Sequence, residues 1–531
     1  MYESSSSSRP PKKRSTPGFR STVTPDERKT ILHAIEEAEK EMKGYDAEIN
    51  RLKASIVLLE GKRNRLSSTV TKYRASLSLV HRLPPEILAE IFKECCFEAS
   101  YASNRPSFPP SSVVLSTVCG RWREVALSTA ALWSSISINT SFWPPLKHEK
   151  LFRATQMLIS RSKRHPLTIR FRSFFNHTTD VMKLLIQNCD RWYDVELALS
   201  RRILGHYVFH DIQGKVPLLK ELTLSCSGEG PVDEPLDVFR DAPALRTLRL
   251  SSTMVSPKVI LPWHQIHSLI LEGCTNSQLY STLLLFPHTR NIEITEVISD
   301  EDVSIPGSSI LSNARMLYIS INYDDELTLL DHLFTFLELP KLQTIRIHQL
   351  ESDGHWDGTP LRECLLKSSC IVTSLRFDGL PISDEHMISL LQLLPNLELL
   401  HLQEPSLSSP QNMIVTHRFL QRLTAHSEFR DWEVAESSSG SGVMIPRLKD
   451  LTLSIYSVPL DQQALVDAIT SRWIPDEDPL LNGGLRSLRK ICLIVDVLDE
   501  DSSSKDEVDF GPLLSLKCFT DVGLDVNIEI R

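Results

Sequence analysis

The chain has 531 residues, of which 41% are hydrophobic and 24% charged, and this length and composition predict several globular domains. Its formal net charge of −9 argues against a dedicated nucleic-acid-binding protein. The longest apolar runs, such as STLLLF (281–286), are far shorter than the ~18–20 residues of a membrane span, and the N-terminus lacks the apolar segment of a secretory signal. We therefore expect neither nucleic acid nor a membrane as a partner.

The ten cysteines are scattered along the chain, and no two of them stand in a CxxC spacing. Zinc sites and disulfide scaffolds need closer spacing or a higher density of cysteines. We therefore expect reduced cysteines, no bound metal and a cytoplasmic or nuclear protein.

Residues 1–23 are rich in Ser, Pro, Lys and Arg, so we expect a disordered basic tail. The cluster RPPKKR (9–14) fits a nuclear-import signal, but a solvated basic tail is the commoner meaning of so short a cluster. Both interpretations are kept, and the protein is expected in the cytoplasm, the nucleus or both.

A single coiled-coil helix is predicted over residues 24–80. Thr24 is placed to cap its start, Pro25 suits the first position, and Glu27 stands where a capping box needs a carboxylate. Core-type residues then recur in alternating steps of three and four, which is typical of a coiled coil, and only Arg63 interrupts them. Such a seam must be covered by another helix: a homodimer is favoured, while packing on the chain's own domains or on a different protein stays open. The seam residues are Ile31, Ile35, Ala38, Met42, Tyr45, Ile49, Leu52, Ile56, Leu59, Leu66, Val70, Tyr73, Leu77 and Val80.

A second helix is predicted in HRLPPEILAEIFKECC (81–96), because Pro84 ends the first helix and Pro85 suits the first position of a new one. Leu83 is expected to fold back on Leu88. At about 100° per residue, the apolar side chains of this helix cover half of its circumference, more than one layer of core requires. One edge of this arc is therefore expected to face the chain's own core, and the other edge to meet a partner.

Another helical pattern, VVLSTVCGRWREVALSTAALW (113–133), follows the linker SNRPSFPPSS (103–112). Short helices over about fifty residues make a very small core, and Trp122 supplies its largest buried side chain. A domain of this size is marginal alone and is plausibly completed by another protein.

The segments LPPEILAEIF (83–92), VCGRWREVA (118–126) and LW (132–133) resemble the F-box, the short helical module of substrate receptors in cullin–RING ubiquitin ligases. The resemblance implies an F-box-like domain at 81–135 that binds a Skp-type adaptor and, through it, a cullin. This sequence departs from the family in one place, since the linker 97–112 replaces the usual middle helix. The implied adaptor contacts are Leu83, Pro84, Ile87, Leu88, Ile91 and Phe92, together with Val118, Trp122 and Trp133, which match positions shared between core and interface. The whole layout resembles F-box proteins that are abundant in mushroom-forming fungi.

The remaining residues, 136–531, carry the repeated pattern apolar-x-x-apolar-x-apolar, which predicts a short strand in each copy. From Val195 to Leu451 the central residues recur every 21 to 30 positions, and the next step, to Ile491, is 40 positions. This period resembles leucine-rich repeats, so we expect an α/β solenoid with flexible insertions near 433–445 and 497–508. Clear copies begin at 219, 245, 266, 342, 372, 397, 448 and 488, and looser copies at 192, 289, 314 and 420.

Strand residues that alternate with the buried ones point to the concave face of such a solenoid. We expect this face to bind a target protein, and an acidic or phosphorylated segment would suit Arg346 and Arg376. Ordinary solvated strand residues are the simpler interpretation of the same side chains. The candidates are Arg249, Glu293, Tyr318, Arg346, Arg376 and His401.

The sequence contains no phosphate-binding loop, no zinc-protease helix and no nucleophile elbow. We therefore expect a non-catalytic protein with no cofactor. The resemblance implies a substrate receptor that holds its target near the ligase, so that ubiquitin transfer becomes effectively intramolecular. The alternative is an oligomeric scaffold without ligase association.

Overall fold

A computed structural model describes residues 24–77, 79–101, 110–140, 148–173, 178–204, 207–227, 236–255, 259–298, 309–322, 326–350, 354–405, 413–425, 443–456, 460–474, 485–496 and 510–531. The chain divides into two units, residues 1–88 and 89–531, and each is described by itself. The predicted tail (1–23) and the predicted insertion at 497–508 lie outside the described residues. No helix in the described ranges is both long and apolar enough to span a bilayer.

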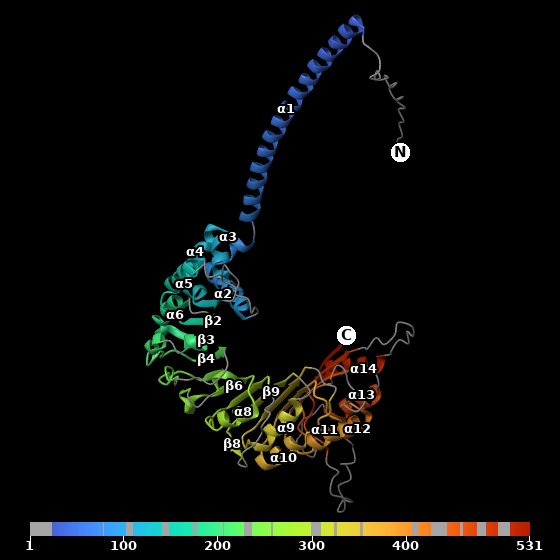
Figure 1. Cartoon of the computed structure of the whole chain (residues 1–531). Coiled ribbons are helices and arrows are strands. Elements are labelled where there is room, and N and C mark those ends of the chain that lie inside the picture. The colour runs from blue at the N-terminus through green and yellow to red at the C-terminus, as the bar shows by residue number, and fades with distance from the viewer. Residues whose placement is uncertain are drawn as a thin grey trace, which may run out of the picture. The chain divides into compact units, whose positions relative to one another are not determined.

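Helix α1 (Pro25–Ser76) forms most of the first unit (Figure 1). The backbone N–H and the hydroxyl of Thr24 both donate to the Glu27 carboxylate, at 3.1 and 2.9 Å. Every side chain from Thr24 to Arg74 is exposed, so no described residue of this unit covers the apolar seam. The long helix is thus confirmed, and its pairing into a coiled coil stays a prediction.

Short helical segments follow: η1 (Leu79–Arg82), α2 (Pro85–Tyr101), α3 (Ser111–Val118), α4 (Gly120–Ser128) and the 3-10 turn η2 (Ala130–Trp133). Helix α2 begins at Pro85, where the proline pair predicts it. The continuous pattern predicted over 113–133 is interrupted at Cys119, which has an extended backbone (φ −156°, ψ 171°). The Cys119 sulfur accepts the backbone N–H of Trp122 at 3.5 Å and so caps α4.

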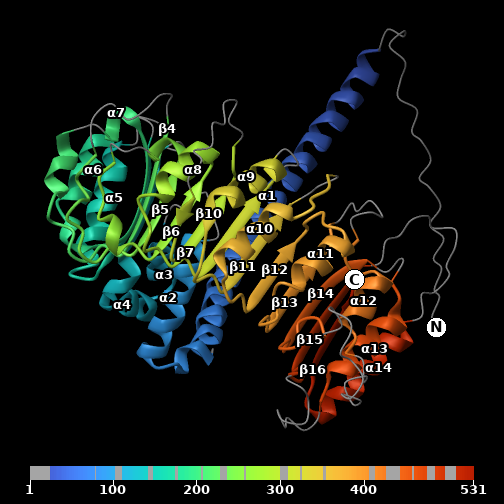
Figure 2. The same cartoon turned by 90° about the horizontal axis from the view of Figure 1, so that it is seen from below.

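The second unit contains a fourteen-stranded parallel sheet in which the strands follow one another in chain order. Each inner strand pairs with the strand before it and the strand after it in this sheet, and each of the two edge strands pairs with one neighbour (Figures 1 and 2). The strands are β1 (Ser135–Asn139), β2 (Leu167–Ser173), β3 (Trp192–Ser200), β4 (Glu221–Ser227), β5 (Thr247–Ser251), β6 (Ser268–Glu272), β7 (Asn291–Thr295), β9 (Met316–Ile321), β11 (Thr344–Gln349), β12 (Ser374–Asp378), β13 (Leu399–Gln403), β14 (Asp450–Tyr456), β15 (Lys490–Asp496) and β16 (Asp525–Ile530). A separate pair joins β8 (Ile310–Leu311) to β10 (Leu337–Glu338). The protein is therefore of mixed α/β class, with a long N-terminal helix followed by a parallel sheet.

Helices connect many of these strands and follow one face of the sheet, as the run from α8 to α13 shows in Figure 2. They are α5 (His148–Arg161), α6 (Thr179–Ile186), α7 (Arg201–Leu204), α8 (Asn276–Leu283), α9 (Glu326–Phe336), α10 (Thr359–Ser368), α11 (Asp384–Leu391), α12 (His417–Leu423), α13 (Gln462–Arg472) and α14 (Gly511–Ser515). Leu248, Leu269 and Leu375, from the centres of three strands, are each 0% exposed. Their neighbours along each strand point to the other side, which we call the open face of the sheet.

One sequence prediction about this sheet is wrong. The copy LQRLTA (420–425) is not a strand but the end of α12, where Leu420 and Leu423 are buried one helical turn apart. Most of the predicted insertion at 433–445 lies outside the described residues, so it stays a prediction; of its last residues, Met444 and Ile445 are buried.

One cation lies inside the core of the second unit. Arg472, at the end of α13, is 1% exposed and donates to the carbonyl oxygens of Leu423 (2.5 Å), Ile445 (3.0 Å) and Met444 (2.6 Å). Burial lowers the pKa of its guanidinium to about 10, which leaves it charged at neutral pH. It therefore joins α13 to the end of α12 and to the segment that follows the predicted insertion.

We expect Arg472→Met to lower the free energy of unfolding by about 2–5 kcal/mol, because three buried carbonyl groups lose their donors. Hydrogen exchange should quicken most at α12 and at residues 443–448, and the apparent Tm should fall. The matched control is Arg422→Met, at an exposed position of α12. Equal melting temperatures for the two variants would contradict the structural role of Arg472.

Candidate functional site

Helix α2 exposes some of its apolar side chains and buries others. Ile87 and Ile91 are 49% and 43% exposed, and their four-residue spacing places them on one face of the helix. Leu88 and Phe92, the next residue after each of them, are 1% exposed. The apolar arc predicted from the sequence is thus divided into a covered edge and an uncovered edge.

The aromatic side chains of this region form its interior. The ring centroids of Phe92 and Trp122 are 4.9 Å apart at a tilted angle. Trp133 is 0% exposed, its indole N–H donates to the carbonyl of Ala126 at 2.7 Å, and the Arg161 guanidinium lies 4.4 Å from its ring centroid. These contacts stabilise a small core, as aromatic packing and a cation over an indole ring do elsewhere.

Helix α3 also has an uncovered apolar pair. Val114 and Val118 are 48% and 57% exposed, again four residues apart on one helix. Val114 was not among the residues predicted from the sequence, and neither was Leu127 of α4, which is 38% exposed. Only the exposure in the folded chain singles them out, because their spacing also fits buried positions.

The nine predicted adaptor residues therefore fall into three groups. Pro84, Ile87, Ile91 and Val118 are exposed, and Leu83 and Trp122 are half-buried. Leu88, Phe92 and Trp133 lie in the interior. For these three a direct docking contact conflicts with their burial in the free chain, and we assign them to the core.

On the open face of the sheet, the strand register aligns the predicted target-binding residues in one row. Tyr318 pairs with Arg346, Arg346 with Arg376, and Arg376 with His401, on four consecutive strands. Arg249 belongs to the same row but stands apart, because β6 and β7 lie between it and Tyr318.

The side chains in this row differ in their partners. Arg376 Nε donates to Asp378 Oδ2 at 2.6 Å, and His401 Nε2 lies 2.8 Å from Asp378 Oδ1. Burial by itself would raise the pKa of Asp378, but the contacts from His401 and Arg376 outweigh it and hold this pKa below its ordinary value. Arg346 is exposed and has no ion pair in the part of the chain that the structure describes, so its charge remains uncommitted.

The N-terminal strands carry an acidic cluster on the open face. Glu196 binds Arg172 at 3.0 Å and lies 3.5 Å from Arg170, whereas Asp194 pairs in register with Glu221 of the next strand. Burial, with the negative charges of Glu221 and Glu196, raises the pKa of Asp194 to about 6, although Arg170 opposes the shift. The two arginines of this cluster are thus already engaged by Glu196.

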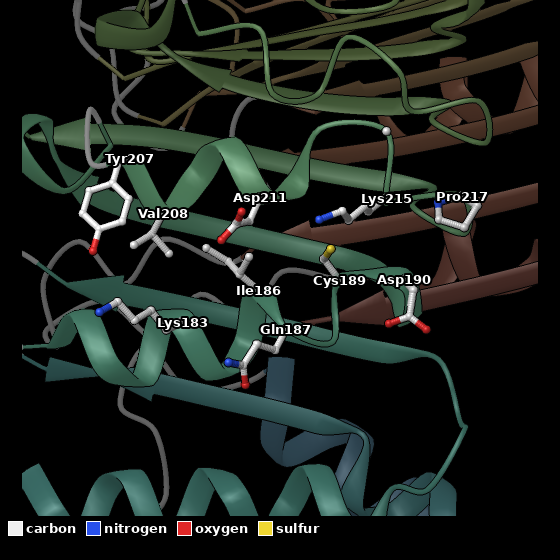
Figure 3. A pocket seen from close by; sticks show the side chains of 11 residues that line it. Lys183, Ile186, Gln187, Cys189, Asp190, Tyr207, Val208, Asp211, Lys215 and Pro217 are labelled. Atoms are coloured by element: carbon white, nitrogen blue, oxygen red, sulfur yellow. The ribbon is translucent and has the colours of Figure 1, made fainter.

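A pocket of about 690 Å³ lies beside α6 and the 3-10 turn η7 (Tyr207–Ile212). Figure 3 shows Lys183 and Lys215 among its lining residues together with Asp190, Asp211 and Cys189. Burial, followed by the charge of Asp190, raises the pKa of the Cys189 thiol, so this sulfur is a poor nucleophile at neutral pH. The mixed charges around it define no particular ligand.

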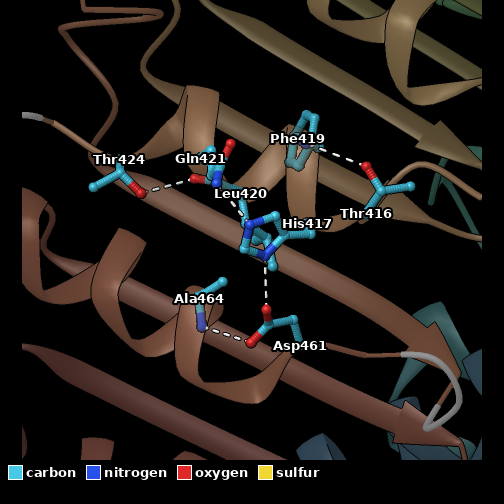
Figure 4. Close-up of polar contacts among 8 residues, drawn as sticks. All are labelled: Thr416, His417, Phe419, Leu420, Gln421, Thr424, Asp461 and Ala464. Carbon is cyan, nitrogen blue, oxygen red and sulfur yellow. Dashed lines mark hydrogen bonds and ion pairs between the residues drawn. The ribbon is translucent and has the colours of Figure 1, made fainter.

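His417 and Asp461 form a polar contact between neighbouring helices (Figure 4). His417 Nδ1 lies 2.7 Å from Asp461 Oδ2, and Asp461 Oδ1 accepts the backbone N–H of Ala464 at 2.9 Å, which caps α13. The Ala464 hydrogen bond and the contact with His417 lower the pKa of Asp461. The pair stabilises a helix start, and within the described ranges no set of three His, Cys, Asp or Glu residues is arranged to hold a metal ion.

Comparison with known families agrees with the geometry of the helical region. Residues 80–139 match the family model described as F-box-like, so the chain carries an F-box-like domain that spans α2, α3, α4, η2 and β1. No curated protein shows significant similarity to the chain. The resemblance in LPPEILAEIF and VCGRWREVA is thus confirmed for this part of the sequence.

Asp194→Asn should stabilise the protein at neutral pH. A carboxyl group with a raised pKa binds its proton more tightly in the folded state, so its contribution to stability is greatest below about pH 4 and is lost as the pH rises through 6. The variant should therefore gain about 1–2 kcal/mol, or roughly 1–2 °C in apparent Tm, at pH 7.5, and nothing near pH 4. Asp241→Asn, at an exposed position, is the control. The same gain at both pH values would count against this assignment.

Proposed function

We propose that the protein is the substrate-receptor subunit of an SCF-type cullin–RING ubiquitin ligase. F-box domains typically bind Skp-type adaptors, and the chain carries an F-box-like domain at residues 80–139. The observation that carries the proposal is the uncovered apolar surface of that domain, where Ile87 and Ile91 on α2, and Val114 and Val118 on α3, meet water. Exposed pairs of this kind are typical of a surface that a second protein covers.

The parallel sheet supports the second half of the proposal, a target-binding array of leucine-rich-repeat type. Its strands follow one another in chain order, and each strand except the last one, β16, buries apolar residues, as stacked repeats do. Its open face carries the exposed Arg346 and the half-buried Tyr318 and Arg376, and arginine and tyrosine are residue types that anchor protein interfaces. Arg346 is the cation on this face best able to bind an acidic or phosphorylated segment, because Arg376 already pairs with Asp378.

In this proposal the chain performs no chemistry of its own. The thiols of Cys96 and Cys274 are neutral at physiological pH, since burial raises their pKa values to about 11 and about 12. The receptor acts by proximity: it holds a target beside the ligase, which raises the effective concentration of the target at the ubiquitin-transferring subunit.

Ile87→Glu combined with Ile91→Glu should weaken binding to a purified Skp-type adaptor at least about tenfold, because each covered isoleucine contributes roughly 1.5–3 kcal/mol. Biolayer interferometry gives the Kd, and circular dichroism checks that the helices remain. Leu88 and Phe92 are unsuitable for this test, because a charge in the core would unfold the domain.

The matched control for the adaptor test is Leu366→Glu with Ile371→Glu, which places two charges at positions that are 60% and 61% exposed outside the F-box-like domain. Its Kd should equal that of the unmodified chain. A folded Ile87/Ile91 variant with unchanged affinity, or an unmodified chain without affinity, would instead favour an oligomeric scaffold that has no link to a ligase.

Arg346→Glu should abolish binding of the target without affecting binding of the adaptor. Proximity labelling with the receptor fused to a biotin ligase, with and without proteasome inhibition, identifies proteins that accumulate near it. Labelling of those proteins should fall about tenfold or more in Arg346→Glu, since a central interface arginine typically contributes 2 kcal/mol or more. Arg422→Glu, on helix α12, should leave it unchanged, and equal labelling in both variants would refute a role for the open face around Arg346.

A further inference from the structure

Helix α1 (Figure 1) carries an apolar seam that no described residue of its own unit covers. Ile35, Ile49, Leu52 and Leu66, spread along the helix, are between 46% and 68% exposed. A continuous stripe of this length is stable in water when another helix packs against it. The charges and the register of the helix identify that second helix.

The two halves of α1 have opposite charge. Residues 25–50 contain eight acidic and four basic side chains, a net charge of −4. Residues 51–76 contain one acidic and seven basic side chains, a net charge of +6. Two copies side by side in parallel would place like charges together along their whole length. In the antiparallel orientation, each acidic half lies against a basic half.

The seam also fits itself in the antiparallel orientation. When two copies overlap completely, Pro25 of one lies opposite Ser76 of the other, and every facing pair of residue numbers adds up to 101. The seam positions then face one another: Ile35 meets Leu66 of the second copy, Met42 meets Leu59, and Ile49 meets Leu52. In heptad notation the seam consists of alternating a and d positions. Each layer of this pairing contains an a residue of one copy and a d residue of the other, as an antiparallel coiled coil requires.

Arg63, which interrupts the seam, distinguishes the two orientations. In a parallel pair aligned without stagger, Arg63 faces Arg63 of the second copy, and two guanidinium groups meet in the same core layer. In the antiparallel pair it faces Ala38, whose small side chain leaves room for the long arginine to reach water beside the acidic half.

The charged residues that flank the seam also favour the antiparallel orientation. Antiparallel pairing brings Glu41 to Lys62 and Asp46 to Lys53 of the second copy, and each contact occurs twice, against one repeated repulsion between Glu39 and Glu60. In a parallel pair, the attraction between Glu48 and Lys53 occurs twice, and so does the repulsion between Glu41 and Asp46, so the two contributions cancel. One feature favours parallel pairing: isoleucine is the commonest residue at one of the two alternating seam positions and leucine at the other. The experiment must therefore distinguish the two orientations.

We propose that α1 binds a second copy of this chain as a fully overlapping, antiparallel two-stranded coiled coil. The 52 residues of α1 make a rod of roughly 78 Å. Because the two copies run in opposite directions, the remainder of each chain continues from an opposite end of this rod. The dimer therefore holds two F-box-like domains at its two ends, and this inference does not depend on what those domains bind.

Cysteine cross-linking of the full-length chain tests whether a second copy covers the seam and whether the two helices are antiparallel. Ile35→Cys and Leu66→Cys are made as separate variants and then mixed, with the unmodified chain as the control for its ten native cysteines. Residues 35 and 66 of one copy are roughly 46 Å apart along the helix, so a disulfide between them joins two copies. We expect a 35–66 cross-link in the mixture, identified by mass spectrometry, and no 35–35 or 66–66 cross-link in either variant alone.

Sedimentation of the same chain gives the stoichiometry. The unmodified chain should be a dimer, and Ile49→Glu with Leu52→Glu should weaken dimerisation at least about a hundredfold, whereas Val57→Glu, an exposed position outside the seam, should not. A monomer, a trimer or larger oligomer, or self-cross-linked single variants would overturn the proposal. A dimer without the 35–66 cross-link would overturn it as well, because the two helices would then not overlap completely.

Discussion

The structure depends on one physical constraint: a single parallel strand cannot bury its own apolar face. Each strand from β1 to β16 in the large sheet pairs with its neighbours in chain order, and central side chains such as Leu248, Leu317 and Leu375 are completely buried. The stack of neighbours supplies the core, so no closed globule is required. The same alternation turns every second side chain to the open face, where burial does not dictate the residue type. That face is therefore free to carry the charges and aromatic rings that a binding function needs.

The stacked strands of the sheet bury their apolar faces, whereas the N-terminal end of the chain leaves apolar surface exposed. The F-box-like domain has a core of a few aromatic contacts, in which Trp133 is held by Ala126 and Arg161, and it leaves Ile87, Ile91, Val114 and Val118 in water. Helix α1 leaves its whole seam in water. Apolar surface of this extent is costly unless other chains cover it. An adaptor on α2 and α3 and a second copy on α1 account for both surfaces, and they leave the sheet to hold a target.

Much of the fold follows from the sequence, and the differences have physical causes. The repeated pattern predicts strands at 219, 245, 342 and 448, whereas the strands begin two residues later, because the first leucine of each copy is buried in the turn before its strand. Strands β2 and β16 lack that leading residue, and β1 was also not predicted, although WSSISI (133–138) fits the pattern with a tryptophan in first place. The copy at 420 failed because leucines three residues apart also fit one face of a helix, here α12. In the site, a half-circle of apolar residues on α2 predicts two contacts but not which edge the chain itself covers. Phe92 packs against Trp122, which lies thirty residues away in the sequence.

The central claim is that the uncovered faces of α2 and α3 bind a Skp-type adaptor. Hydrogen exchange of the full-length chain, measured with and without a stoichiometric amount of purified adaptor, tests it most directly. The account predicts slower exchange in the adaptor complex, concentrated at residues 85–92 and 111–118, with the strands of the sheet unchanged. An unaltered exchange pattern at saturating adaptor, or protection confined to the sheet, would contradict it.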